Sequence, residues 1–255
     1  MPYSHAQSAR SGLRRAGLLY GIAAYTAFNA VVMYCTGFVG NFLVPFTIDA
    51  GRAPDAPGAV LIDLALLALF GLQHSVMARP GFKAWMTRHV PRDLERSTYV
   101  ALSSGLLAVA MWQWRPLPAI VWQVDAGWAQ AVLWILFASG WTLALAATFF
   151  TDHFELLGIK QAFAYFRGQP HVPGEFREAA VYRWVRHPIM LGQAVAFWAA
   201  PTMTVGHLLF AAVMLTYILI GLYFEERDLV AAHGKSYRDY QRRTPKLIPR
   251  PPRRP

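Results

Sequence analysis

Polar side chains that could carry out chemistry gather at the ends of the long apolar runs of this 255-residue chain. Histidine exchanges protons near neutral pH, and a carboxylate can orient a histidine. Ionisable residues at the level of a membrane are candidates for function because placing them there is costly. We therefore expect a candidate site where five segments bring such residues to one depth. They are Gln73, His74, Ser75, Glu95, Arg96, Tyr99, Asp152, His153, Glu155, Arg183, Arg186, His187, Glu225 and Glu226.

The sequence Arg186-His187-Pro188 predicts the start of a helix. Proline is favoured in the first helical turn, where its missing N–H costs nothing. Arg186 and His187 then lie at a helix N-terminus, where amide donors and the helix dipole favour an anion. An arginine beside such a terminus suits a carboxylate. Gly192, one turn later, would let another backbone or a ligand approach closely.

The elements that must position these residues are membrane helices. The chain is 55% hydrophobic and 15% charged, with a mean hydropathy of +0.29. A soluble domain of this length carries about 25% charged residues. The formal charge of +10 resides in segments beside apolar runs, which favours contact with anionic lipid over nucleic acid. The single cysteine, Cys35, excludes an intrachain disulfide.

We predict an all-α integral membrane protein with five to six transmembrane helices. A spanning helix needs about 20 mostly apolar residues. The last two segments would form a helical hairpin, because 201–206 reads as a turn. The candidate spans are Ala16–Val44, Gly58–Met77, Thr98–Trp114, Gly127–Phe150, Pro188–Ala200 and Val205–Phe224.

One membrane domain is expected to cover residues 1–255. Residues 1–150 would hold four spans, 151–250 a loop, the hairpin and a C-terminal helix, and 251–255 a tail. Aromatic spacing predicts an interfacial helix over Phe154–Phe166. A polar helix is expected over Glu225–Arg243, with a break near Gly234.

The distribution of cations predicts the orientation. Of the 24 Lys and Arg residues, all but Arg52 and Arg115 fall in the segments that lie on one side if six helices cross. Cytoplasmic loops are rich in Lys and Arg. We therefore expect a multi-pass protein of the cytoplasmic (inner) membrane with both termini in the cytoplasm.

The order of motifs in the C-terminal third, from Arg186-His187-Pro188 through Glu225-Glu226 to Pro245-Lys246, resembles the isoprenylcysteine carboxyl methyltransferase superfamily. The resemblance covers roughly residues 170–250 and implies a site for S-adenosylmethionine. Glu225 would bind the methionine ammonium. The loop Glu175-Phe176-Arg177 lies where that family has further cofactor contacts, although the residue types differ. The other cofactor residues that the resemblance implies are Tyr182, Arg186, His187 and Pro188, and Gly192 is added to them because a ligand could approach closely there.

The rest of the chain is similar to a group within the NnrU-like membrane proteins, the methanethiol S-methyltransferases. The likeness lies in Gln73–Arg79, Glu95–Tyr99 and Asp152–Gly158. It implies S-adenosylmethionine-dependent methylation of a small volatile thiol, most simply methanethiol to dimethyl sulfide, in a pocket at the cytoplasmic side of the membrane. The expected substrate residues are Gln73, Ser75, Arg96, Tyr99 and Asp152.

Methylation of a thiol requires the thiolate, so a proton must leave the sulfur. Histidine is the usual acceptor near neutral pH, which makes His153 and His74 the candidates. Glu155 or Asp152 could orient the histidine, and Arg96 could stabilise the thiolate. The chemistry requires no metal.

Other functions remain open at this point. The acceptor could be another thiol or a prenylcysteine carboxylate. A non-catalytic membrane subunit or a small-molecule channel is the alternative outside catalysis. A channel should place polar residues along the middle of its spans, whereas here the mid-span residues are nearly all apolar. That pattern favours a one-sided site and an enzyme whose partners are the thiol and the bilayer, with no nucleic acid and no obligate protein partner.

Overall fold

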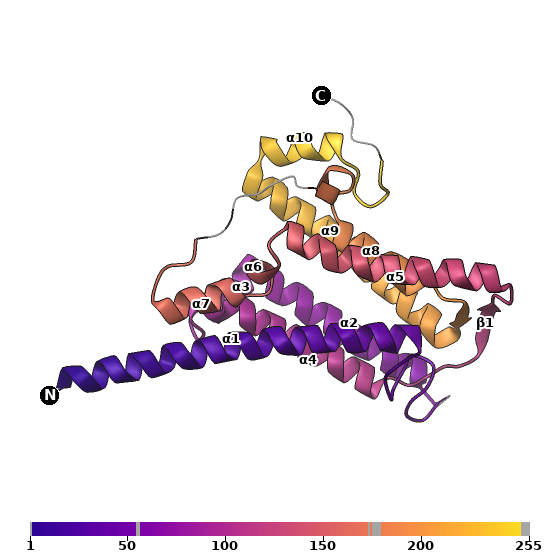
Figure 1. Ribbon diagram of the computed structural model, residues 1–255, viewed down its shortest axis with the longest axis horizontal. Helices are drawn as coiled ribbons and strands as arrows, with labels where there is room; N and C mark the ends of the chain where they lie inside the picture. Colours follow the sequence, from indigo (N-terminus) through magenta and orange to yellow (C-terminus); the bar gives the residue numbers. More distant parts are fainter. Residues whose placement is uncertain (1, 55–56, 173, 175–179, 251–255) are drawn as a thin grey trace. The chain divides into compact units, whose positions relative to one another are not determined.

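Helices make up most of the chain (Figure 1). The structure, a computed structural model, describes residues 2–54, 57–172, 174 and 180–250. The elements are α1 (Pro2–Gly40), α2 (Ala59–Ala78), α3 (Pro80–Met86), the 3₁₀ helix η1 (Arg92–Leu94), α4 (Glu95–Gln113), β1 (Ile120–Gln123), α5 (Gly127–Phe150), α6 (His153–Leu156), α7 (Ile159–Arg167), the 3₁₀ helix η2 (Ala180–Arg183), α8 (Pro188–Trp198), β2 (Thr202–Thr204), α9 (Val205–His233) and α10 (Lys235–Arg243).

Four helices in the described part of the chain are long and apolar enough to cross a membrane: α1 from Ser11, α2, α5 and α9. Large apolar side chains such as Leu61 and Trp128 are exposed on them, as expected where lipid covers the surface. The prediction of a mostly helical, multi-pass membrane protein is therefore confirmed. The two other predicted spans, Thr98–Trp114 and Pro188–Ala200, correspond to α4 and α8. Serines and two charged residues lower the hydropathy of α4, and α8 has only 11 residues. The count of five to six spans stays a prediction.

A two-stranded antiparallel sheet corrects the purely helical prediction. β1 pairs with β2, with Ile120 opposite Thr204 and Gln123 opposite Thr202. These strands lie in the segments that precede α5 and α9. Backbone amides outside a helix need other partners wherever water is scarce, and the two connecting segments supply them to each other. Hydropathy does not reveal such pairing, because the strands are far apart in the sequence.

Glycines decide where several helices end. α9 continues past the predicted end at Phe224, through Glu225, and stops before Gly234, whose φ is +57°. The predicted break near Gly234 is therefore confirmed. The interfacial helix predicted over Phe154–Phe166 divides into α6 and α7 at Gly158, whose φ is +86°. A Cβ at Gly158 would lie 2.8 Å from the amide nitrogen and hydroxyl of Ser97, so this position excludes side chains.

The chain forms two compact units. The first contains Met1–Cys35, Ala68–Trp112 and Asp152–Glu175, and the second contains Thr36–Leu67, Gln113–Thr151 and Phe176–Pro255. The single membrane domain expected from the sequence stays a prediction. The core of the first unit is formed by Met77, Met86, Tyr99, Val100 and Leu157.

Aromatic rings and a close helix pair build the second unit. Phe210 contacts Phe38, Trp114 and Phe197, with ring centroids 5.1–6.1 Å apart. Figure 1 shows α5 running beside α8, and the two helices are in extensive contact. Gly140 on α5 and Gly192 on α8 meet there. A Cβ at Gly192 would lie 2.4 Å from the carbonyl oxygen of Gly140.

Candidate functional site

In the second unit, the start of α8 is bound to the C-terminal segment. Pro188 is the first residue of α8 and His187 its N-cap, as the sequence predicted. The amides of Arg186 and His187 donate to the carbonyls of Pro245 and Lys246, at 2.9 and 3.3 Å. These two amides, which the sequence suggested for an anion, therefore have partners within the protein.

The Arg186 side chain is engaged in the same way. Its Nε and Nη2 lie 2.8 and 2.6 Å from Oε1 of Glu226, and its Nη1 donates to the carbonyls of Gln241 and Thr244. Lys246 Nζ lies 3.1 Å from the other oxygen of Glu226. Arg186 thus joins α8, α9 and the end of α10 around one buried carboxylate.

His187 lies between two adjacent glutamates of α9. Its Nε2 is 3.2 Å from Glu226 Oε1, and its Nδ1 is 3.7 Å from Glu225 Oε2. Burial lowers the pKa of His187 below its usual value, so the ring is neutral at pH 7. The Glu225 side chain is 44% exposed, against 10% for Glu226. Glu225 is therefore the carboxylate of this cluster that a ligand can reach.

Tyrosines line the same region. The Tyr182 hydroxyl donates to the carbonyl of Ala147, and its own carbonyl accepts from Tyr240 at 2.6 Å. Burial raises the pKa of Tyr182, and it raises the pKa of Tyr237 to about 12. Both phenols are consequently neutral donors at physiological pH.

Gly192 meets a backbone. Its nearest neighbours are the Gly140 carbonyl and the Ala144 amide of α5. The close approach that the sequence predicted at this glycine is thus made by a helix, and its role toward the cofactor stays a prediction. The predicted cofactor residues Glu175, Phe176 and Arg177 lie outside the described residues.

In the first unit, the predicted proton acceptor His153 lies beside Tyr25 of α1. Its side chain is buried, and its Nε2 lies 3.1 Å from the hydroxyl of Tyr25 on α1. The two rings meet edge to face, with centroids 5.6 Å apart. Burial lowers the pKa of His153 below its usual value, so at pH 7 the ring is in the neutral form that accepts a proton.

Two acidic residues next to His153, Asp152 and Glu155, stabilise the conformation of the chain around α6. Asp152 has a φ of +77°, caps α6 by accepting from the Glu155 amide, and pairs with Lys160, which lowers the pKa of Asp152. Glu155 accepts from the Gly174 amide at 3.2 Å and lies 3.5 Å from His171 Nε2. Both carboxylates therefore hold the chain around α6 and the loop after α7.

Three further predicted residues gather at α4. The Arg96 guanidinium lies 5.0 Å from the centre of the Tyr99 ring, and its Nε donates to the Leu156 carbonyl at 2.6 Å. The His74 ring stacks on Tyr99 with centroids 4.9 Å apart. The structure thus brings α2, α4 and α6 together within this unit, as the sequence predicted for their polar ends.

Gln73 and Ser75 make local contacts on α2. The Gln73 amide contacts the sulfur of Met77, and its oxygen accepts from the Ser103 hydroxyl at 3.3 Å. The Ser75 carbonyl accepts from Arg79. Their roles toward a substrate stay predictions.

Sequence reasoning missed two residues that the geometry singles out. Tyr25 gave no signal, because one tyrosine in an apolar helix resembles any interfacial aromatic residue. Glu226 was noticed only as part of the Glu225-Glu226 doublet, and the burial that separates the two is a tertiary property.

Comparison with known proteins identifies the family. The family model described as "NnrU protein" matches residues 62–246, more than half of the chain. The chain belongs to the NnrU family. This NnrU-family chain is similar to the methanethiol S-methyltransferase of Mycobacterium tuberculosis, with 50% identity over 236 residues that cover 92% of this chain and 97% of the relative.

Two further relatives match a large part of the chain. Methanethiol S-methyltransferase 2 of Bradyrhizobium diazoefficiens is 50% identical over 240 residues, 93% of this chain and 91% of its own. Nurim from Sus scrofa is 31% identical over 175 residues, 66% of each chain. The resemblance read from the motifs is confirmed, and the NnrU-family chain is an enzyme of the S-methyltransferase class.

Proposed function

We propose that the protein transfers the methyl group of S-adenosylmethionine to the sulfur of methanethiol, which loses its proton, and releases dimethyl sulfide and S-adenosylhomocysteine. One observation carries this proposal: relatives named methanethiol S-methyltransferase are 50% identical to the chain over more than nine-tenths of both sequences. The acceptor thiol, the methyl donor and the side of the membrane are the parts that require direct tests.

The methyl donor is assigned to the cluster around His187. When bound, S-adenosylmethionine supplies an electrophilic methyl group on a sulfonium. An amino-acid ammonium needs a carboxylate that it can reach, and the half-exposed Glu225 fits that requirement beside the neutral His187. Arg186 is a positioning residue, because its guanidinium holds Glu226 and the carbonyls at the end of α10.

The thiol is assigned to the residues around α6. His153 accepts the proton from the thiol sulfur, since its ring is neutral at pH 7. Tyr25 orients the ring through the 3.1 Å hydrogen bond. His74, stacked on Tyr99 beside Arg96, is the second candidate for this proton.

The active site is assigned to the cytoplasmic side of the membrane. All but two of the 24 Lys and Arg residues fall in the sequence segments that share one side of the membrane with the candidate residues if six helices cross. Because cations are retained on the inner side, both termini are placed in the cytoplasm and the protein in the inner membrane.

Headspace gas chromatography tests the reaction. Purified full-length protein in detergent receives S-adenosylmethionine and methanethiol, and dimethyl sulfide is measured over time. Glu225→Gln is compared with Asp228→Asn, an exposed acid three residues later on the same helix. Calorimetric titration of S-adenosylmethionine is run on each protein.

We expect product from the wild type and from Asp228→Asn, and loss of both product and cofactor binding in Glu225→Gln. Cofactor binding without product would redirect the proposal to another acceptor. Neither product nor binding, in protein with native helix content, would refute the enzyme and leave the non-catalytic alternative.

A further inference from the structure

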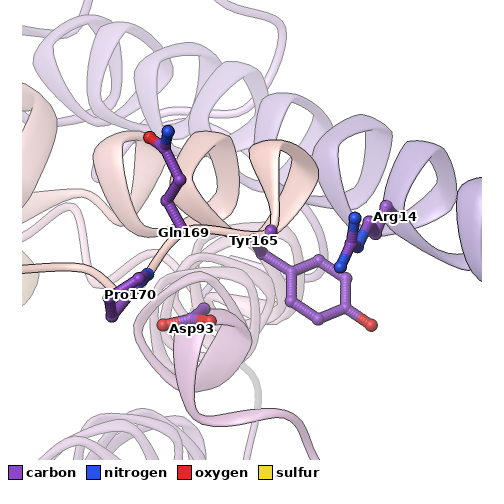
Figure 2. A pocket seen from close by; sticks show the side chains of 6 residues that line it. Arg14, Asp93, Tyr165, Gln169 and Pro170 are labelled. Atoms are coloured by element: carbon purple, nitrogen blue, oxygen red, sulfur yellow. The ribbon is translucent and has the colours of Figure 1, made fainter.

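A pocket of about 270 Å³ lies in the first unit, and none of the residues assigned to the thiol is among those that line it (Figure 2). It is formed by the N-terminal part of α1, by η1, and by α7 with the segment that follows it. The volume is just below the range of about 300–1,000 Å³ typical of sites for drug-sized molecules, so it suits a smaller group. Its lining residues are Arg14, Asp93, Tyr165, Gly168, Gln169 and Pro170.

Two glycines shape this pocket. The Tyr165 ring packs on Gly17 of α1, where a Cβ would lie only 2.6 Å from the ring carbon Cδ1. The Arg14 guanidinium lies over Gly168, where a Cβ would lie 2.5 Å from its central carbon. Gly168 has a φ of +67° and ends α7, so a side chain there would be strained as well as blocked.

The charges of the pocket point to a ligand. Arg14 and Asp93 line the same cavity, yet among the described residues neither makes an ion pair or hydrogen bond with the other or with any third group. Elsewhere in the first unit an acid does pair with a cation, as Asp152 does with Lys160. Figure 2 shows the Tyr165 ring between Arg14 and Asp93. The pocket therefore presents a cation and an anion on its two sides, each available to a group of opposite charge.

Each charge also has an ordinary explanation. Arg14 lies over the C-terminal end of α7, and Asp93 precedes the N-terminus of α4, so both are favoured by helix dipoles. The dipoles account for each residue separately. They do not account for an open cavity between them.

The pocket lies at the expected level of the membrane surface. Arg14 is in the first turn of the span that begins at Ser11. α7 exposes Phe163 and Phe166, and the Arg167 guanidinium lies 4.3 Å from the centre of the Phe163 ring. Aromatic and basic side chains of this kind are typical of a helix in the headgroup region.

We propose that this pocket binds a phosphoethanolamine group, with Arg14 bound to the phosphate and Asp93 to the ammonium. Arginine suits phosphate because its planar guanidinium presents paired N–H donors. A ligand that carries only a negative charge would be repelled by Asp93, and a ligand that carries only a positive charge would be repelled by Arg14. The same chemistry occurs in the headgroup of phosphatidylethanolamine and in free phosphoethanolamine.

Native mass spectrometry of the full-length protein tests this proposal. The protein is equilibrated in mixed micelles with phosphatidylethanolamine or with phosphatidylglycerol, and the fraction that keeps one lipid is measured. Arg14→Gln and Asp93→Asn each remove one charge. Arg14→Lys keeps the cation, and Arg15→Gln removes an exposed neighbour outside the pocket.

We expect phosphatidylethanolamine to be retained over phosphatidylglycerol. Arg14→Gln and Asp93→Asn should each weaken that retention by about tenfold or more, as for loss of one charge-assisted hydrogen bond. Arg15→Gln should stay within about twofold of the wild type. Arg14→Lys keeps the cation but loses the paired donors, so its retention should lie between those of Arg14→Gln and the wild type. Equal retention of the two lipids, an equal loss in Arg15→Gln, or unchanged retention in Asp93→Asn would each overturn the proposal.

Competition separates the two sources of the ligand. Free phosphoethanolamine that displaces the lipid at millimolar concentration would show that the headgroup alone is recognised. Failure to displace it, with the variant pattern intact, would assign the site to the membrane lipid. Displacement by inorganic phosphate as effective as that by phosphoethanolamine would show that Asp93 binds nothing, and would refute a zwitterion site.

Discussion

Arg186 Nη2 lies 2.6 Å from Glu226 Oε1, and both side chains are buried. The preceding residue of α9, Glu225, is half-exposed beside His187. Two adjacent glutamates therefore differ in burial, because neighbouring positions of a helix point about 100° apart. Glu226 holds the end of the chain against α8, and Glu225 is the more accessible of the two.

This division predicts opposite effects for two conservative substitutions. Glu226→Gln leaves Arg186 and Lys246 without their buried counter-charge and should lower the free energy of unfolding by about 3–5 kcal/mol. Glu225→Gln should change it by less than about 0.5 kcal/mol while abolishing binding of S-adenosylmethionine. Thermal unfolding in detergent and calorimetric titration measure the two quantities. A stable Glu226→Gln variant that no longer binds the cofactor would reverse the assignment.

The contact between α5 and α8 predicts the cost of a single methyl group. In Gly192→Ala the new Cβ would lie 2.4 Å from the Gly140 carbonyl oxygen, so the helices must separate. We expect a loss of about 1–3 kcal/mol in the free energy of unfolding. Gly221→Ala on α9 is the matched control, because a Cβ there meets nothing within 4 Å. In that control the free energy of unfolding should increase by up to about 1 kcal/mol. Equal effects of the two substitutions would contradict the packing argument.

Burial of His187 predicts how stability depends on pH. Its pKa in the folded protein is lower than the usual 6.5, so the unfolded chain takes up the proton first as the pH falls. The contribution of His187 to the free energy of unfolding is therefore fully present above about pH 6.5. It declines as the pH falls from there to the pKa of His187 in the folded protein. Melting temperatures between pH 5 and 8 should show a shallower decline in His187→Gln than in the wild type. Parallel curves of melting temperature against pH for the two proteins would show that protonation of His187 does not affect stability.

The hydrogen bond between Tyr25 and His153 predicts a kinetic effect without a change in cofactor affinity. Tyr25→Phe keeps the ring but removes the hydroxyl 3.1 Å from Nε2. If this bond orients the proton acceptor, kcat should fall about tenfold and the pH profile of kcat should shift, while the Kd of S-adenosylmethionine stays unchanged. The control is Tyr20→Phe, which removes a more exposed hydroxyl, bonded to Thr98, from the same helix. Equal activities of the two variants would leave His153 without a positioning partner.

Local signals were enough for many of the elements. The hydropathy of Gly127–Phe150 predicted α5 with its bounds, since a run of 24 apolar residues has few other conformations in a membrane. Pro188 marked the start of α8, and Gly234 marked the end of α9, because each residue restricts or frees its own backbone. The motifs also indicated the family and the S-methyltransferase class, since residue types in order are a property of the sequence.

Tertiary structure decided how those residues are used. Hydropathy did not reveal the pairing of β1 with β2, the burial of Glu226 or the bond between Tyr25 and His153. The pairings of β1 with β2, of Arg186 with Glu226 and of Tyr25 with His153 each join positions at least 40 residues apart, so no local pattern encodes them. The sequence determined which residues were present at each helix end. Only the packed chain decided which of them are bound to each other and which stay open to a ligand, because burial and distance depend on the surrounding helices as well as on the residue itself.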